Sequence, residues 1–399
     1  MYMIVTLIVI CLCFCLLELL VDKYPKAQRQ IFNIAFLVIA VLCTARYAYG
    51  RDILNYIPFY NNITGSYAYN VAHDLTQFEP GFAFFCSVCK GFHLTYWGMT
   101  AVISILYWGA IYWLFSYIKT HPCFALLALV TLDHAVFLEQ IRQCLAVALI
   151  IYAFCFYHKF SWKIIPLALL IISTTMHKTV LPFLFFLMVA RLFYGLKTES
   201  KAYFLLAVLL VSFMVIALHP LLRQFVPFLP SSLQISVEYH LMVGKRIQKI
   251  FFLYFMVIIC LGYYTLKTDA DKREKIYHWL IWSMILVIVI LYQYYLILYR
   301  IRSYILPFLL VWLLNTMETT PVKNQLAKQM LGLMMILFSI SLTFELPKRY
   351  EKMKGQTDRV SWVWERRNHT QQELIDRQIE QAKLFWKYDN DKGLQMGFR

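Results

Sequence analysis

Residues 122–157 read PCFALLALVTLDHAVFLEQIRQCLAVALIIYAFCFY, two apolar runs on either side of the charged corner from Glu139 to Arg142. Each run has a length at which an apolar helix can cross a lipid bilayer. Helices satisfy their own backbone hydrogen bonds in lipid, whereas the strands of a membrane barrel give short alternating segments. The stretch therefore predicts two membrane-spanning helices joined by a tight turn that gathers ionisable side chains at one membrane face.

The same pattern continues along most of the chain. Of its 399 residues, 61% are hydrophobic and 15% are charged, whereas soluble domains carry about 25% charged residues. This composition excludes a soluble enzyme, a disordered chain, a collagen and a disulfide scaffold. We predict an all-α, polytopic membrane protein with about twelve spans, between about 11 and 13. The predicted spans are 3–21, 31–49, 97–118, 122–138, 140–157, 162–176, 179–195, 202–219, 249–266, 277–299, 302–317 and 327–345.

Residues 1–345 form one transmembrane domain in this prediction, and residues 346–399 form a basic tail. The tail could be an amphipathic helix on a surface or a solvated helix. Within the long loop 50–96, residues 81–93 are apolar but too few to cross a bilayer. They indicate a short interfacial or re-entrant helix.

The loops alternate in their content of basic residues. One set carries most of the lysines and arginines, including Lys23 to Arg29 and Lys267 to Lys275, and enrichment in these residues marks cytoplasmic loops. The opposite set holds the loop 50–96 and the corners at Glu139 and His177, so it faces the outside, as does the N-terminus. The net charge of +16 therefore reflects topology and anionic membrane lipid rather than a nucleic-acid partner.

Ionisable residues inside spans cost about 2.5–3.5 kcal/mol each at the bilayer centre, so they mark candidate functional positions. Arg46, Arg51, Asp52 and Tyr56 form the first group, at the outer end of the second predicted span. The arginines could bind an anion beside a carboxylate. Alternatively, Arg46 is an interfacial arginine whose charge reaches water.

The end of the outer loop and the corner of the first hairpin supply two more groups. Glu79 could be a base, a partner of an arginine, or an N-terminal helix cap, and the following Pro80 favours the cap. At the corner, Glu139 and Arg142 are three residues apart and could pair on one helix face. Four ionisable groups lie within 133–142, more than one structural ion pair uses, which favours a functional role.

Two further positions complete the set of candidates. His177 titrates near neutral pH and could be an acid or base, or a polar turn residue. Arg300 and Arg302, which precede Tyr304, would point about 200° apart on a continuous helix. Either the chain turns there, or only one of the two arginines reaches a site.

No P-loop and no H-E-x-x-H motif is present, and no D-x-D offers an evident metal site, so we expect neither a cofactor nor a metal ion. Arginines, carboxylates and a histidine at one membrane face suit a polar, anionic substrate with a lipid tail. Arginine fits phosphate because it stays charged and can bind two oxygens at once.

The order of these motifs resembles that of EpsG-like proteins, bacterial exopolysaccharide polymerases similar to Wzy, over about residues 30–310. The matching motifs are Arg46…Gly50-Arg51-Asp52…Tyr56, Glu79-Pro80-Gly81, Ile141-Arg142-Gln143-Cys144-Leu145-Ala146, His177 with Thr179, and Arg300…Tyr304.

The resemblance implies a glycosyltransferase of the bacterial inner (cytoplasmic) membrane, with its active site facing the periplasm or cell exterior. Such a polymerase of exopolysaccharide, capsule or O-antigen moves a growing glycan from undecaprenyl pyrophosphate to a lipid-linked repeat unit. The implied partners are the undecaprenyl-pyrophosphate-linked oligosaccharide, membrane lipid, and chain-length regulator and flippase proteins. Electrostatic stabilisation by arginines would serve the leaving pyrophosphate without a metal ion.

We expect Arg142 to be the principal pyrophosphate ligand. The other expected substrate-binding residues are Arg46, Arg51, Arg300, Arg302, Gln143, Tyr56 and Tyr304. The candidates for the catalytic base are Asp52, Glu79, Glu139 and His177. We favour His177 slightly over Asp52, because Glu139 could pair with Arg142 and Glu79 could cap a helix.

Four alternatives stay open at this point. The chain could be a transferase that uses a polyprenyl-phosphate sugar, or a ligase for finished glycans. It could also transport or flip lipid-linked sugars, although charges at one face argue against this, since transporters place them near the midplane. The fourth alternative is a membrane acyltransferase that uses His177 as its base.

Overall fold

The computed structural model describes residues 2–46, 53–160, 163–196, 274–291 and 295–319, with isolated positions between 201 and 228 and at 376. The predicted spans 202–219, 249–266 and 327–345 and the tail 346–399 lie wholly or largely outside these residues. So do the candidate residues Arg51 and Asp52.

Every regular element in the described part of the chain is an α-helix. Five helices are long and apolar enough to cross a membrane: Met3–Leu20, Pro25–Thr44, Tyr96–Phe115, Ile141–Lys159 and Ile297–Asn315. Four shorter apolar helices accompany them: Pro122–Leu138, Ile164–Met176, Val180–Gly195 and Lys275–Leu291. The predicted fold class, an all-helical membrane protein, is confirmed, while the number of twelve spans stays a prediction.

The chain divides into two compact units. The first comprises residues 1–178 and 310–385, and the second comprises residues 179–309 and 386–399. The helices of the first unit are α1 (Tyr2–Leu20), α2 (Pro25–Thr44), α3 (Ile53–Asn62), α4 (Tyr67–Ala72), α5 (Pro80–Gly91), α6 (Tyr96–Phe115), α7 (Pro122–Leu138), α8 (Ile141–Lys159) and α9 (Ile164–Met176).

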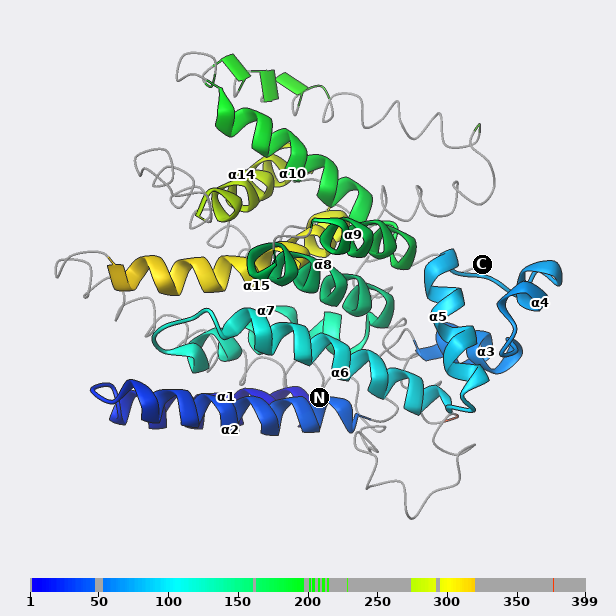
Figure 1. The fold of residues 1–399 in the computed structure, drawn as a ribbon, viewed down its shortest axis with the longest axis horizontal. Helices are drawn as coiled ribbons and strands as arrows, with labels where there is room; N and C mark the ends of the chain where they lie inside the picture. Colours follow the sequence, from blue (N-terminus) through cyan, green and yellow to red (C-terminus); the bar gives the residue numbers. More distant parts are fainter. Residues whose placement is uncertain are drawn as a thin grey trace, which may run out of the picture. The chain divides into compact units, whose positions relative to one another are not determined.

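In the first unit, α7 packs against α1, α2, α6 and α8, and α8 packs against α6 and α9 (Figure 1). Almost every side chain of α7 is buried, as expected for a helix that is apolar on all sides and lies inside a bundle. By contrast, α9 exposes Ile164, Leu167 and Ile171. Their spacing places them on one helix face, which suits contact with lipid.

The loop between α2 and α6 folds into α3, α4 and α5, which gather at one end of the unit (Figure 1). The buried Asn70 holds α4 in place, because its Nδ2 donates to Thr64 O at 2.8 Å and to Ser87 Oγ at 2.9 Å. Helix α5 is the short helix that the sequence predicted near 81–93. Its Cys86 and Cys89 are buried free thiols.

The second unit contains α10 (Val180–Gly195), which packs against α14 (Glu274–Leu291). Tyr194 Oη lies 3.0 Å from His278 Nδ1, and Phe193 and Trp282 have ring centroids 4.5 Å apart. Helix α15 (Tyr295–Thr319) begins in this unit.

The predicted turn at Arg300 is wrong, because α15 is helical on both sides of this residue. Arg300 and Arg302 therefore lie on one continuous helix and point in different directions. A polar interruption of an apolar sequence suggested a loop, but a helix can carry arginines where protein surrounds them. Helix α2 also ends five residues before the predicted limit of its span, at Thr44.

Candidate functional site

Arg142 is the second residue of α8, and its guanidinium reaches away from its own helix. Nη1 donates to Glu79 Oε2 at 2.5 Å, and Nε donates to Tyr56 Oη at 3.0 Å. These partners come from the segment before α5 and from α3. The arginine at the start of one apolar helix is therefore held by two side chains of the segment between α2 and α6.

The predicted pairing of Glu139 and Arg142 on one helix face is wrong, because no continuous helix joins them. Helix α7 ends at Leu138, and Gln140 has φ −90° and ψ 65°, outside the helical region. The spacing of three residues therefore does not place the two side chains one turn apart. The carboxylate that pairs with Arg142 is Glu79.

Glu79 stands at the N-cap position of α5, yet its side chain makes no capping hydrogen bond. Oε2 accepts from Arg142, and Oε1 accepts from the backbone N–H of Lys178 at 3.3 Å. The interpretation of Glu79 as a helix cap is therefore wrong for the side chain. This carboxylate instead connects the start of α8 with the turn that follows α9.

A close approach between α5 and α9 makes this connection possible. A Cβ atom placed on Gly81 would lie 2.8 Å from Thr175 Cβ and closer still to Thr175 Oγ1. Real side chains do not tolerate such distances, so only glycine lets the first turn of α5 pack this closely on the last turn of α9. Lys178 follows Thr175 by three residues, and its backbone N–H donates to Glu79.

Aromatic rings surround the ion pair. The Arg142 guanidinium carbon lies 4.4 Å from the ring centroid of Phe78 and 5.5 Å from that of Tyr56. Phe59 and Phe82 pack behind Phe78 at 4.8 and 6.0 Å. Apolar walls exclude water and strengthen the electrostatic interactions of the cation.

The pair is not sealed. The side chain of Arg142 is 23% exposed and that of Glu79 is 6% exposed. Nε and Nη1 hold protein partners, and part of the Arg142 side chain stays exposed beside them. The arrangement is a fixed cation with one open side, suited to an anionic group.

Arg46 lies inside the first unit. Its Nη1 donates to Phe137 O at 2.5 Å and to Ser104 Oγ at 2.7 Å, so it joins the end of α2 to α7 and α6. Its Nη2 is buried and meets no acceptor in the part of the chain that the structure describes. Neither nitrogen reaches water at this position, unlike the charge of an interfacial arginine.

His177 is buried and follows α9 directly, with extended backbone angles of φ −155° and ψ 125°. The next residue, Lys178, donates the N–H that Glu79 accepts. His177 therefore lies one residue from the Glu79 contact. Gln143, beside Arg142, is buried within α8.

Arg302 and Tyr304 are described within the second unit, as is Arg300. The Arg302 guanidinium lies 4.4 Å from the ring centroid of Tyr299. Tyr304 Oη is 2.9 Å from Thr179 Oγ1, and its ring stacks on Phe183 with centroids 5.2 Å apart. The pairing of Tyr304 with Thr179 joins two residues that the sequence motifs placed in separate groups.

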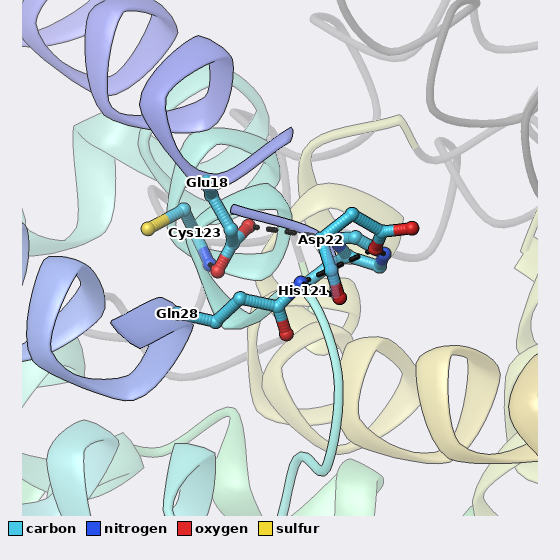
Figure 2. Close-up of polar contacts among 5 residues, drawn as sticks. All are labelled: Glu18, Asp22, Gln28, His121 and Cys123. Atoms are coloured by element: carbon cyan, nitrogen blue, oxygen red, sulfur yellow. Dashed lines mark hydrogen bonds and ion pairs between the residues drawn. The ribbon is translucent and has the colours of Figure 1, made fainter. Parts of the chain in front are cut away.

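A second polar cluster lies where α1 ends and α7 begins, and the sequence analysis did not predict it (Figure 2). Glu18 Oε1 accepts from the Cys123 N–H at 3.2 Å, and its Oε2 lies 3.9 Å from His121 Nδ1. His121 Nε2 lies 3.0 Å from Asp22 Oδ1, which also accepts from Gln28 Nε2 at 3.3 Å. Glu18, an acidic residue inside the first apolar run, was the sequence signal that could have revealed this cluster.

Sequence reasoning also missed Phe78, Thr175 and the backbone of Lys178. Phe78 directly precedes Glu79 but belongs to no periodic pattern. A backbone N–H has no signature in sequence. Their parts in the site became visible only once α3, α5, α8 and α9 were placed together.

Comparison with known proteins identifies a family. A protein-family model described as the EpsG family matches residues 29–353, well over half of the chain. No curated protein and no solved structure matches.

Proposed function

The chain belongs to the EpsG family, and from this membership we propose that it is a membrane-bound polysaccharide polymerase, a glycosyltransferase. In this proposal it transfers a growing glycan from undecaprenyl pyrophosphate to the sugar of an incoming lipid-linked repeat unit. The product is an exopolysaccharide, a capsule or an O-antigen. The reaction takes place on the outer side of the bacterial cytoplasmic membrane.

The observation that carries the proposal is the partly exposed Arg142, held by Glu79 and Tyr56. A pyrophosphate leaving group develops negative charge as its bond to the sugar breaks. A guanidinium fixed beforehand in an apolar setting stabilises that charge without reorganising. The backbone N–H groups at the start of α8 add a favourable dipole for an anion.

The reaction needs a base as well as an anion site. The acceptor hydroxyl oxygen attacks the anomeric carbon of the donor glycan, and the bond from that carbon to the pyrophosphate oxygen breaks. The pyrophosphate leaves with the electron pair, and the hydroxyl proton passes to the base. Both Glu79 oxygens accept hydrogen bonds, so we assign Glu79 to positioning Arg142. His177 stays our first candidate for the base, ahead of Asp52, with Glu139 third.

The partners in this proposal follow from the substrate. They are the lipid-linked oligosaccharide, membrane lipid, and proteins that flip the repeat unit and regulate chain length. No nucleic acid is involved. The other substrate-binding residues predicted from the sequence stay part of the proposal: Arg46, Gln143, Arg300, Arg302 and Tyr304.

Incubation of the purified protein with one lipid-linked repeat unit tests the activity. We expect a ladder of products, and we expect Arg142→Lys to lose most of it, because lysine cannot reproduce the forked contacts. Arg29→Lys is the matched control, because the Arg29 guanidinium likewise donates a hydrogen bond, here to Phe115 O, and lies over an aromatic ring, that of Phe32. A single transfer without a ladder would indicate a ligase, and full activity of Arg142→Lys would refute the site.

Cysteine labelling in intact cells tests the topology. We expect an impermeant maleimide to label Ala68→Cys in α4, and to leave Lys26→Cys unlabelled until the membrane is opened. The native thiols near Ala68 give little background, because burial raises the pKa of Cys89 to about 11 and that of Cys86 well above its usual value. Labelling of Lys26→Cys alone in intact cells would reverse the orientation and place the site in the cytoplasm.

A further inference from the structure

Helix α5 has two different faces. On one face, Phe82, Cys86 and Cys89 are buried inside the first unit, to which α5 belongs. On the opposite face, Phe84 is 53% exposed, Val88 is 39% exposed and Phe92, just past the last turn, is 75% exposed. Positions four residues apart lie on one side of a helix, so these three side chains form a single apolar row, which we call the α5 stripe.

The α5 stripe is held rigidly in this exposed orientation. Ser87 Oγ on the other face accepts from Asn70 Nδ2 at 2.9 Å, and Lys90 Nζ donates to Tyr60 O at 3.0 Å. The first turn of α5 is locked on α9 by the approach of Gly81 to Thr175. A row of large apolar side chains fixed in this way indicates a surface that receives an apolar partner.

The position of the stripe relative to the anion site identifies the partner. Glu79, which pairs with Arg142, directly precedes α5. At 1.5 Å per residue, Phe84 lies about 8 Å along the helix from Glu79, and Phe92 about 20 Å. The stripe therefore begins about 8 Å along α5 from the residue that pairs with Arg142, and it continues away from that residue as a single apolar row.

The surface beside the start of α5 is also apolar. Helix α9, which contacts Gly81 through Thr175, exposes Leu167, Ile171 and Ile172. This exposed face of a membrane helix is where lipid chains reach the protein. The α5 stripe thus adjoins a lipid-facing surface at the end that carries the site.

We propose that the α5 stripe binds the isoprenoid tail of the lipid-linked substrate and directs its pyrophosphate to Arg142, an inference that rests on the proposed function. A single row of side chains matches the width of one isoprenoid chain. Its two phenylalanines offer flat rings to the methyl branches and double bonds of that chain. The tail and the pyrophosphate are covalently joined, so binding of one places the other.

The test compares two donors that carry the same glycan pyrophosphate, one on the full undecaprenyl tail and one on a tail of two isoprene units. In detergent micelles we expect the double variant of Phe84→Ser and Phe92→Ser to raise KM for the full-length donor about tenfold, because two apolar rings no longer pack against the tail. The KM for the short donor and kcat for both should stay unchanged. Val71→Ser is the control, since Val71 is a similarly exposed side chain on α4.

Each other outcome overturns the inference. Equal increases in KM for both donors would mean that the substitutions distort the pyrophosphate site and that the stripe does not bind the tail. Unchanged KM for both would mean that bulk lipid, detergent or water covers it. If the double variant does not fold, a photoreactive full-length donor on the unaltered protein decides, since it should crosslink within α5. Crosslinks elsewhere alone would refute the tail site, whereas absence of polymer from the unaltered protein would refute the proposed function instead.

Discussion

Two glutamates connect helices in the first unit, and their surroundings differ. Glu18 and Glu79 each accept a hydrogen bond from a backbone N–H of another segment, Cys123 in one case and Lys178 in the other. Each also lies beside a basic side chain, His121 or Arg142. Helix α7 runs between the two clusters, since it begins at Pro122 and ends four residues before Arg142.

The difference lies in what each glutamate leaves available to a ligand. Glu18 is fully buried, and it fixes the first turn of α7 against α1. Glu79 fixes a guanidinium that is partly exposed and flanked by Phe78. A buried carboxylate can therefore serve stability in one place and orient a reacting group in another. The two glutamates differ in whether a ligand can reach the basic side chain beside them.

The largest effect that follows from this comparison is on activity. We expect Glu79→Gln to lower polymer formation about 100-fold, as for removal of one oriented group from an anion-stabilising site. The amide keeps the size of the side chain but loses the charge that holds Arg142. The measurement is the initial rate of ladder formation, with the melting temperature recorded on the same samples. Near-normal rates would show that Arg142 does not need this partner.

A second, smaller loss should follow from Gly81→Ala. The added methyl would lie 2.8 Å from Thr175 Cβ, so the start of α5 must move away from α9 and take Glu79 from the Lys178 N–H. Overpacking of this kind costs about 1–3 kcal/mol, and we expect a rate loss of about tenfold in the ladder assay. Gly98→Ala is the control, because its nearest side-chain contact would be an ordinary 3.4 Å. Equal behaviour of the two variants would rule out the positioning role of Gly81.

The helical fold could be predicted from the sequence because apolar length alone determines most of it. The span 122–138 matches α7 at both ends, since Pro122 opens the helix and the charged corner closes it. The same rule failed at Arg300, where a charge inside an apolar run suggested a turn and α15 continues through it. Hydropathy measures the cost of a residue in lipid and cannot tell whether protein surrounds it.

The sequence predicted which residues belong to the candidate site, but it did not predict which of them contact one another. Arg142, Glu79 and Tyr56 were each identified by residue type, but the pairs they form join positions 63 and 86 residues apart. Local spacing favoured Glu139 as the partner of Arg142. The turn between α7 and α8 removed that local geometry, and a distant carboxylate took its place.

The smallest expected effect on activity belongs to the Glu18 cluster. Glu18→Ala leaves the buried Cys123 N–H without its acceptor, which costs about 2 kcal/mol of unfolding free energy. We expect a lower melting temperature and an unchanged rate per folded molecule, because α7 shields the other cluster from this change. A rate loss as large as that of Glu79→Gln would show that the two clusters are coupled through α7.

Asp22→Asn refines this last prediction within the same cluster. Asp22 Oδ1 lies closer to His121 than Glu18 does, at 3.0 Å against 3.9 Å. Distance alone would therefore make Asp22 the stronger partner. However, the side chain of Asp22 is 61% exposed, and exposed ion pairs contribute about 0–1 kcal/mol. We expect Asp22→Asn to change the melting temperature far less than Glu18→Ala does. The reverse order would mean that the contact with His121, rather than the buried hydrogen bond to Cys123, holds the start of α7 against α1.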